Sequence, residues 1–387
     1  MRVTIEKMVY GGAGLARTEH GVVFVPKTAP GDVVEIDIEQ KKKDYATGRV
    51  REIVTPSPDR QSPTCPNFDT AGCCHWQHIR YDRQLEIKEA ILRESLSRLG
   101  KIQYEGEIRR ISGPDASYRL RANFHVRHGK LGFAQENTNL IVPIRECAAL
   151  APELNEFIPI ANRMIGEATE VHAATAAGQV AAAFVSENQT VRFEKEPVFV
   201  EVRGMKYRLD PQAFFQANRF LLDAFVDEVM RQCGPTPKDV LELFCGSGFF
   251  TIPLAQQCGR IIGVESGRVA IKHAQSNAKL NGAENTQFEL GEVEALLSNA
   301  DVEPDLVLLN PPRSGAGVKA AALVADLAAP RVVYVSCNPS TFAREAKVLC
   351  EQGYTLTCLT LVDQFPNTYH IELVASFDRM REVLDAV

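Results

Sequence analysis

The chain has 387 residues, of which 45% are hydrophobic, so it can bury a sizeable core and form two or three domains. Its formal net charge of -6 excludes a protein that is basic over its whole surface, so any contact with nucleic acid has to use local patches of Lys and Arg. No apolar run is long enough to span a bilayer, and the first residues lack the apolar core of a signal peptide. We therefore expect a cytoplasmic protein with no membrane partner.

Residues 1–58 form the first predicted unit. Apolar and polar positions alternate and are interrupted by glycines and prolines, which predicts a small barrel of short β-strands. The run Lys41-Lys42-Lys43 with Tyr45 places three cations and an aromatic ring at a predicted hairpin, which is either a phosphate and stacking contact or a solvated turn. The segment resembles a TRAM domain, a small barrel that RNA-modifying enzymes carry as an RNA-binding appendage. The resemblance implies that this unit contacts RNA.

A cysteine cluster follows the barrel. Cys65, Cys73 and Cys74 lie within ten positions, which packing alone does not explain. Cys147 brings the number of thiols to four, which suits an iron-sulfur cluster or a structural zinc ion. In a cytoplasmic protein, clustered cysteines indicate a metal site rather than disulfides.

Two further units are predicted between the barrel and the C-terminal half. Residues 59–80 and 102–205 form a central β-rich domain that carries the cysteines, and residues 81–101 form an amphipathic helix that packs on the C-terminal domain. The buried stripe expected for this helix consists of Leu85, Ala90, Ile91, Leu96 and Leu99. One strand of the central domain carries three arginines on one face, open either to solvent or to RNA: Arg119, Arg121 and Arg127.

From residue 206 onward, strands alternate with helices, which predicts an α/β domain with a parallel sheet covered on both faces. Its first strand runs into a loop containing Gly246 and Gly248. Glu265 ends the next strand about 20 residues further on, where an acidic residue binds ribose hydroxyls. Thr251 stands where a dinucleotide-binding fingerprint has its third glycine, which argues against an oxidoreductase. A later strand ends in Asn310-Pro-Pro, a turn that lines the methyl-transfer pocket of methyltransferases.

A strand that ends at a cysteine is the most informative stretch of the C-terminal domain. Cys337 is followed by Asn338, which suits a helix N-cap, and by Pro339, which suits the first helical position. The positive end of a helix favours a thiolate, so Cys337 is either a reactive thiol or a buried core residue. If the last strand runs antiparallel to the others, Glu372 at its start faces Cys337 across one crevice.

Several segments together resemble the RNA uracil-C5 methyltransferases, which methylate 23S ribosomal RNA or the T-loop of transfer RNA. The resemblance covers nearly the whole chain, and its most specific segments are 214–218, 243–249, 336–341 and 365–372. It implies a class I methyltransferase Rossmann-like sheet and the cofactor S-adenosyl-L-methionine. It also implies that Cys337 attacks C6 of uracil and that Glu372 removes the C5 proton. The positions that match the family's cofactor-binding residues are Gln216, Phe244, Gly246, Gly248, Glu265, Glu292 and Asn310.

The chain departs from the family pattern at three places. The family usually has aspartate at the position of Asn310 and asparagine at that of Phe249. The usual cysteine spacing places a cluster ligand at Ala71, so Cys73 has to act as a displaced ligand. The four cysteines are therefore expected to hold a [4Fe-4S] cluster, with zinc or an incomplete cluster as alternatives.

Alternative functions differ in what they leave unexplained. RNA cytosine-C5 methyltransferases resemble a pattern with a cysteine directly after the Pro-Pro turn, where this chain has Arg313. The barrel and the cysteine cluster favour 23S ribosomal RNA over transfer RNA as the partner, by analogy. A non-catalytic RNA-binding iron-sulfur protein is the alternative from another class. No obligate protein partner is indicated.

Overall fold

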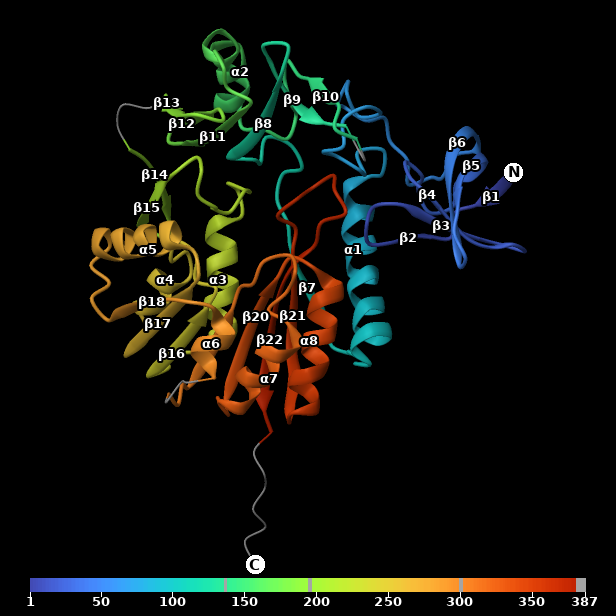
Figure 1. Cartoon of the computed structure of the whole chain (residues 1–387). Helices are drawn as coiled ribbons and strands as arrows, with labels where there is room; N and C mark the ends of the chain where they lie inside the picture. The colour runs from blue at the N-terminus through green and yellow to red at the C-terminus, as the bar shows by residue number, and fades with distance from the viewer. Residues whose placement is uncertain (136–137, 194–196, 299–301, 381–387) are drawn as a thin grey trace, which may run out of the picture.

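The computed structural model describes residues 1–135, 138–193, 197–298 and 302–380. The C-terminal domain is a large sheet flanked by helices. The central domain lies above one end of this sheet, and the N-terminal barrel lies to the side of both (Figure 1). Within the described residues, no helix is both long and apolar enough to cross a membrane.

The N-terminal barrel is a six-stranded sheet, as predicted. Its strand order is β1-β5-β6-β4-β3-β2. The turn end of the long β5–β6 hairpin contains the three lysines. Tyr45, the first residue of β6, is 41% exposed and packs edge-on against the ring of Phe24. The strands are β1 (Arg2–Thr4), β2 (Lys7–Met8), β3 (Gly14–Thr18), β4 (Gly21–Val25), β5 (Val33–Lys41) and β6 (Tyr45–Thr55).

The central domain is an antiparallel sheet covered by one helix. The sheet has the order β10-β9-β8-β11-β12-β13, and α2 (Pro152–Met164) packs its buried apolar face on it. The cysteine segment, residues 59–80, consists of turns that lie between the barrel and this domain. The strands are β8 (Arg121–Arg127), β9 (Lys130–Ala134), β10 (Ile141–Pro143), β11 (Glu170–Ala176), β12 (Gln179–Val185) and β13 (Thr190–Arg192).

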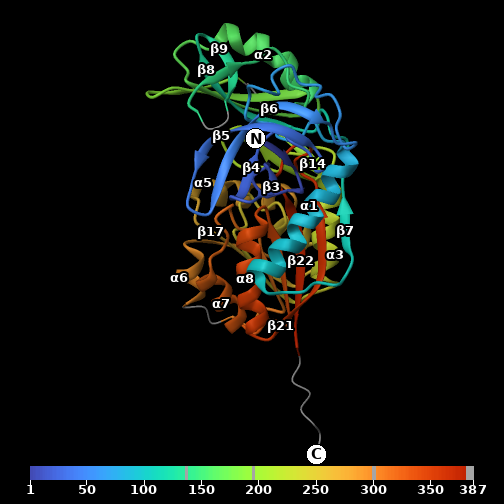
Figure 2. The ribbon, with the colours of Figure 1, turned by 90° about the vertical axis from the view of Figure 1, so that its right-hand side faces the viewer.

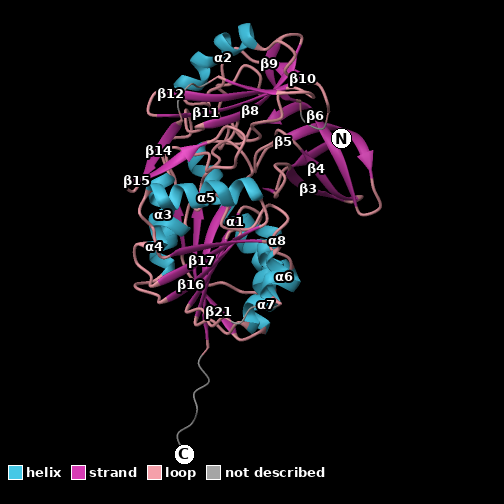
Figure 3. Cartoon of the chain, turned by 60° about the vertical axis from the view of Figure 1, so that its left-hand side comes forward, coloured by secondary structure: helices cyan, strands magenta, loops and turns pink. Residues whose placement is uncertain are grey.

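The C-terminal domain is built on an eight-stranded sheet of order β18-β17-β16-β19-β20-β22-β21-β7. The neighbours β18, β17, β16, β19 and β20 pair in parallel, whereas β22 is antiparallel to both β20 and β21. Helices cover both faces (Figure 3), as a parallel sheet requires. The strands are β7 (Ile108–Ile111), β16 (Asp239–Leu243), β17 (Arg260–Glu265), β18 (Thr286–Leu290), β19 (Leu306–Leu309), β20 (Arg331–Ser336), β21 (Tyr354–Val362) and β22 (Glu372–Arg379). The helices are α3 (Leu222–Cys233), α4 (Thr251–Ala255), α5 (Arg268–Leu280), α6 (Val293–Leu297), α7 (Val318–Asp326) and α8 (Pro339–Glu351).

Helix α1 (Tyr81–Ser95), extended by a π-helical turn over Leu96–Gly100, lies along the C-terminal domain beside α8 and β7 (Figure 2). The predicted apolar stripe is only partly correct, because Ile91 and Leu96 are buried but Ala90 and Leu99 are exposed. Polar residues take part of the buried face. Lys88 is fully buried, and its Nζ lies 2.5 Å from Asp363 Oδ1 in the loop after β21. Removing either partner leaves a buried charge, at a cost of about 3–5 kcal/mol.

Two segments assigned to the central domain instead join the C-terminal domain. Strand β7 lies within 102–205, yet it pairs with β21 at the edge of the eight-stranded sheet. The predicted boundary at residue 206 falls inside a hairpin of β14 (Val198–Val202) and β15 (Met205–Leu209). That hairpin is bound to α5, since Lys206 N and Arg208 N donate to the side chains of Asn281 and Asn277.

Candidate active site

The register of two strands brings the predicted nucleophile and base together. In the pairing of β20 with β22, Ser336 lies opposite Leu373, so Cys337 and Glu372 follow at the same end of the sheet. We call this end, where β16, β17, β19 and β20 finish and β22 begins, the catalytic edge. The antiparallel final strand predicted from the sequence is therefore correct, and it places a carboxyl group beside the thiol.

The helix start behind Cys337 forms as predicted. Asn338 is the N-cap of α8, and its side chain accepts a hydrogen bond from Ser340 N at 3.0 Å. Pro339 has no N–H, so the first two donors of the helix are absent or occupied. Burial, and then the nearby Glu372 carboxylate, raise the pKa of Cys337 to about 12.

Glu372 is buried at the start of β22. Burial raises its pKa to about 8, while Arg313 acts in the opposite direction. A carboxyl group with a pKa near neutrality can both accept and release a proton, which suits a general base.

Arg313 is a site residue that the sequence analysis did not assign. It follows the Asn310-Pro-Pro turn, its carbonyl accepts a hydrogen bond from Asn338 Nδ2 at 3.0 Å, and its guanidinium lowers the pKa of both Cys337 and Glu372. The next part of this loop is fixed by Glu345 of α8, which accepts hydrogen bonds from Ala316 N and Gly317 N. The only signal in the sequence was the position of Arg313, three residues after Asn310.

Tyr10 is a second residue that the sequence did not indicate. It belongs to the turn between β2 and β3 of the barrel, and its hydroxyl donates to the Cys337 carbonyl at 3.5 Å. Burial, followed by the charges of Cys337 and Tyr369, raises its pKa to about 12. The barrel therefore reaches the catalytic edge through Tyr10.

Gln364, in the loop that leads to Glu372, is a buried polar residue that the sequence analysis did not indicate. It is 1% exposed, and neither polar atom of its amide has a hydrogen-bond partner within the described residues.

The glycine loop has the geometry of a nucleotide-binding turn. Gly246 and Gly248 have positive φ angles of 56° and 81°, which glycine adopts without strain. The Glu265 carboxylate accepts hydrogen bonds from Gly246 N at 3.2 Å and from Gly267 N at 2.7 Å, so it is held beside the loop.

Other predicted cofactor residues surround this loop. Phe244 and Glu292 line one cavity of about 440 Å³. Asn310 directly follows β19, and its N–H donates to Leu243 O at 3.2 Å. Gln216 is buried beside Phe215, which packs against Phe249 in an aromatic cluster. Phe249 therefore serves the core, where the family usually has asparagine.

The four predicted metal-binding cysteines lie close to one another without forming a ligand set. The contact with Cys73 and burial, and then the charges of Cys73, Cys147 and Cys65, raise the pKa of Cys74, so the four thiols lie near one another. The contact with Cys74 lowers the pKa of Cys73 to about 7. Within the described residues, no group of three or more Cys, His, Asp or Glu side chains is arranged to hold a metal ion.

One member of the predicted arginine face, Arg121, bonds within the protein. Arg121 is half-buried, burial lowers its pKa to about 10, and it donates to Phe215 O and Pro211 O at 3.4 and 3.5 Å. It therefore joins the central domain to the loop that contains Gln216.

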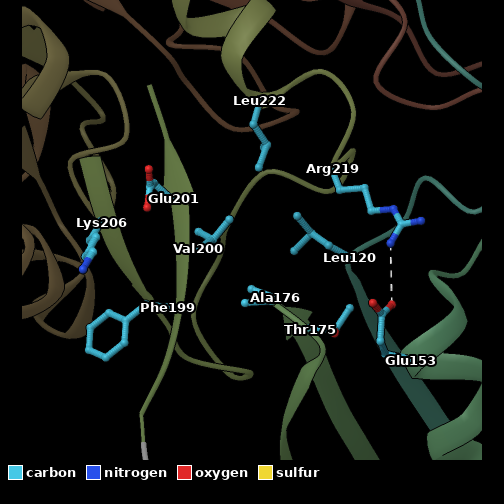
Figure 4. Close-up of a pocket in the computed structure, with 11 residues that line it drawn as sticks. Leu120, Glu153, Thr175, Ala176, Phe199, Val200, Glu201, Lys206, Arg219 and Leu222 are labelled. Carbon is cyan, nitrogen blue, oxygen red and sulfur yellow. Dashed lines mark ion pairs between the residues drawn. The ribbon is translucent and has the colours of Figure 1, made fainter. Parts of the chain in front are cut away.

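Another cavity, of about 500 Å³, lies between the β14–β15 hairpin and the central sheet. Its wall includes an ion pair between Arg219 and Glu153, 3.6 Å apart (Figure 4). None of the predicted site residues lines it, so we do not assign it to catalysis.

Comparison with known proteins identifies the family of the chain. The family model described as tRNA (uracil-5-)-methyltransferase matches residues 185–379, and that of the TRAM domain matches residues 1–50. The 23S rRNA (uracil(1939)-C(5))-methyltransferase RlmD of Methylococcus capsulatus is 35% identical over 97% of this chain and 96% of its own. An Aquifex aeolicus protein described as an uncharacterized RNA methyltransferase is 34% identical over 97% of both chains.

A solved structure supports the fold as a whole. The Pyrococcus abyssi tRNA (uracil-54, C5)-methyltransferase, in complex with S-adenosyl-L-homocysteine, superposes with a TM-score of 0.76 at 24% identity and covers 97% of this chain and 100% of its own. Given the family match and relatives aligned over almost their full lengths, the chain belongs to the tRNA (uracil-5-)-methyltransferase family and carries an N-terminal TRAM domain.

Proposed function

We propose that this protein methylates C5 of a uridine in structured RNA, with Cys337 as the nucleophile and Glu372 as the base. The observation that carries the proposal is the pairing of β20 with β22, which sets both groups at the catalytic edge beside the Asn310 turn and the glycine loop. The target base has to leave its stack to reach them, which an RNA-binding appendage assists.

The chemistry requires both residues. C5 of uracil is too weak a nucleophile to attack a methyl sulfonium. Addition of the Cys337 thiolate to C6 gives C5 carbanion character, so that C5 can take the methyl group. Glu372 then accepts the C5 proton, the C6–S bond breaks, and Cys337 is released.

Arg313 provides a means of forming the thiolate in a buried site. Both Cys337 and Glu372 have raised pKa values, and the Arg313 guanidinium lowers both. Its charge stabilises the thiolate before attack and the Glu372 carboxylate before proton removal. Replacing Arg313 with Met should slow adduct formation by about 10- to 100-fold, as expected for losing a charge-assisted hydrogen bond.

The residues around the glycine loop fit S-adenosyl-L-methionine. Bound there, the cofactor supplies an electrophilic methyl group. The Glu265 carboxylate is positioned to accept hydrogen bonds from ribose hydroxyls. The remaining residues that would hold the cofactor are Gln216, Phe244, Gly246, Gly248, Glu292 and Asn310.

The four cysteines would hold a [4Fe-4S] cluster as a structural group. Four thiols close together are the donor set that such a cluster needs, and Cys74 and Cys147 are buried. The contact between Cys73 and Cys74 would have to open, with Cys73 acting as a ligand in place of the residue at Ala71. Anaerobic purification followed by iron and sulfide analysis tests this, and zinc without sulfide would support the alternative ion.

The preferred substrate is 23S ribosomal RNA, and the proposal includes a cytoplasmic location. A relative named for 23S rRNA shares 35% identity with this chain, against 24% for the transfer-RNA enzyme of known structure. The T-loop of transfer RNA is the second candidate.

The decisive experiment uses 5-fluorouridine. Fluorine cannot leave C5 as a proton, so the enzyme should stay covalently attached to the RNA through Cys337. We expect an adduct with a 23S rRNA fragment that contains 5-fluorouridine at the target position, and none with Cys337→Ala. A T-loop RNA tested in parallel distinguishes the two substrates. If neither RNA gives an adduct, the proposed mechanism is wrong.

A further inference from the structure

Arg313 lies in a tight turn that is attached to helix α8. A hydrogen bond from Gly315 N to Pro312 O at 2.8 Å closes the turn, so Arg313 is one of its two central residues. The Arg313 carbonyl accepts a second hydrogen bond, from Asn338 Nδ2 at 3.0 Å. We call residues 312–317 the arginine loop. Because the turn is closed, the position of Arg313 depends on the position of the whole loop.

The carboxylate of Glu345 occupies the inner side of the arginine loop. Its Oε1 accepts a hydrogen bond from Gly317 N at 2.9 Å, and its Oε2 accepts one from Ala316 N at 3.2 Å. A Cβ added to Gly315 would collide with Glu345 Oε1. Gly315 also has a φ of +83°, which glycine adopts without strain. The loop therefore follows the surface of this carboxylate without space for a side chain between them.

Glu345 is a buried carboxylate that depends on the loop for its hydrogen bonds. It is 3% exposed, and the three groups that donate to it are uncharged: the two backbone N–H groups of the arginine loop and the hydroxyl of Tyr334. A carboxylate taken out of water is costly unless hydrogen bonds replace its hydration. Because the loop supplies two of these three bonds, the carboxylate strongly favours one conformation of the loop.

One face of α8 makes these contacts to the arginine loop. Asn338, Thr341 and Glu345 are spaced by three and four residues, so they lie on one side of the helix. Thr341 packs against the loop, since a Cβ on Gly315 would lie 3.0 Å from Thr341 Cβ. Cys337 directly precedes the N-cap of the same helix. The nucleophile and the arginine loop are therefore both fixed to α8.

The position of the Arg313 charge matters for the reaction. Burial raises the pKa of Cys337 and of Glu372, and the Arg313 guanidinium acts against burial at both groups. It also hydrogen-bonds to the Cys337 side chain, an interaction that weakens steeply with distance and angle. Displacing the arginine loop would therefore make the thiolate harder to form without removing any reacting group.

A purely structural role for Glu345 is the alternative. Gly317 is the N-cap of α7, and a carboxylate near the N-terminus of a helix is stabilising in itself. In that case the loss of Glu345 would weaken the fold, and its effect on the reaction would be the same with or without Arg313. Dependence on Arg313 is thus the property that separates the two roles.

We propose that Glu345 is a positioning residue for the reaction, which holds the arginine loop so that the Arg313 guanidinium meets Cys337 and Glu372. The inference rests on the proposed RNA methylation, in which Cys337 attacks the base. Glu345 acts through Arg313 and not on the substrate. Tyr334, whose hydroxyl donates to Glu345, holds the carboxylate from the side of the core.

The test is a double-mutant cycle on adduct formation with RNA containing 5-fluorouridine, at saturating S-adenosyl-L-methionine. Glu345→Gln replaces one acceptor oxygen with an NH2 group, so the side chain cannot accept from both loop N–H groups. Adduct formation should slow by about 10- to 100-fold, the cost of a displaced reacting group. In the Arg313→Met protein, the same substitution should slow it by less than about twofold. Tyr334→Phe should give a smaller fall, of up to about fivefold, which also requires Arg313.

The pH profile of kcat gives a second readout. The wild-type kcat should rise through pH 8 as Glu372 loses its proton. Glu345→Gln and Arg313→Met should both move this rise to higher pH, because the charge that opposes burial is displaced in one protein and absent in the other. Cys337 and Tyr10, the other titratable groups whose pKa values respond to Glu372, are unchanged in both variants. A weakened fold would lower kcat without moving the rise.

The control is Glu351→Gln, which changes an exposed carboxylate at the last residue of α8 and should keep the wild-type rate and pH profile. The inference is overturned if Glu345→Gln slows the adduct by the same factor with and without Arg313, or leaves the pH profile unmoved. Should Glu345→Gln fail to fold, Tyr334→Phe decides by the same comparison. A wild-type enzyme that forms no adduct refutes the proposed function, whereas a wild-type adduct with unaffected Glu345→Gln and Tyr334→Phe proteins refutes the positioning role alone.

Discussion

The catalytic edge and the cysteine segment both gather reactive side chains, but they do so by different means. At the catalytic edge, Cys337 and Glu372 come from strands that are 35 residues apart in sequence, and the sheet register fixes them opposite each other. In the cysteine segment, three cysteines are close in sequence, yet their present arrangement is not a metal site. Cysteines that are close in sequence therefore need not be arranged as ligands, whereas the pairing of two strands fixes the relative positions of the residues at their ends.

The largest expected effect comes from removing the nucleophile. Cys337→Ala should lower methyl transfer by at least about 10⁴-fold, because no other group adds to C6. RNA binding should remain, since the barrel and central domain are untouched. Methyl transfer from labelled cofactor and filter binding measure the two effects. Cys350→Ala, at the far end of α8 from Cys337, is the matched control. Retained methylation in Cys337→Ala would favour a different mechanism.

Replacing the base should separate attack from release. Glu372→Gln keeps the shape of the side chain and should slow turnover by about 10²- to 10⁴-fold. Because the base acts after the thiol has added, the covalent complex with ordinary uridine should accumulate, visible by denaturing electrophoresis. Glu351→Gln, on an exposed residue of α8, is the control. Slow turnover without accumulation would assign Glu372 to an earlier step.

The pH dependence tests the environment of the same base. The pKa of Glu372 is raised to about 8 in the folded protein, so kcat should rise as the pH passes through 8. A raised pKa also means that the buried carboxyl group favours folding below its unfolded pKa, and that this contribution is lost as the pH rises through 8. Glu372→Gln should therefore increase the melting temperature relative to wild type at pH 9 but not at pH 4. An equal change at both pH values would argue against a raised pKa.

Changes at the four predicted metal-binding cysteines should affect stability more than chemistry. Cys147 is buried and fixed by Asn155, which bonds both its N–H and its carbonyl. Cys147→Ser should lower the free energy of unfolding by about 1–3 kcal/mol, with a larger loss in protein that carries a cluster. Denaturant unfolding, set beside 5-fluorouridine adduct formation, measures the contrast. If a folded Cys147→Ser protein fails to form the adduct, the predicted metal-binding cysteines affect the chemistry at the catalytic edge, which would contradict this prediction.

The smallest expected effect concerns the cofactor pocket. Asn310→Asp introduces the negative charge that the family usually has near the sulfonium. An added charge pair at a partly open site contributes about 1 kcal/mol, so the KM for S-adenosyl-L-methionine should fall by about fivefold. Isothermal titration calorimetry with the cofactor and with its demethylated product measures whether the substitution strengthens or weakens binding. Weaker binding of both would show that Asn310 is adapted to this pocket.

The sequence predicted most of the catalytic edge because that edge depends on local signals. The apolar runs Arg260–Glu265 and Arg331–Ser336 are bounded by turn residues, and these strands end at Glu265 and directly before Cys337, as predicted. Cys337, Glu265 and Asn310 follow directly from their positions at strand ends. Local patterns of this kind require no knowledge of tertiary contacts.

Residues missed by the sequence analysis depend on contacts between distant segments. Tyr10 reaches Cys337 across 327 positions, and Lys88 pairs with Asp363 across 275. A buried lysine breaks the apolar period of α1, so its stripe was misplaced. Strand β7 pairs with β21 more than 240 residues away, a contact that no local pattern encodes.

The position of β22 also has a consequence for synthesis. Although β22 is the last strand within the described residues, it lies between β20 and β21 and pairs with both. Until it arrives, the apolar strand that leads to the nucleophile is an open edge on the nascent chain, which favours pairing with other chains. The other strands of the sheet are synthesised before β22, which brings Glu372 to Cys337. The site can therefore become active only after β22 has inserted between β20 and β21.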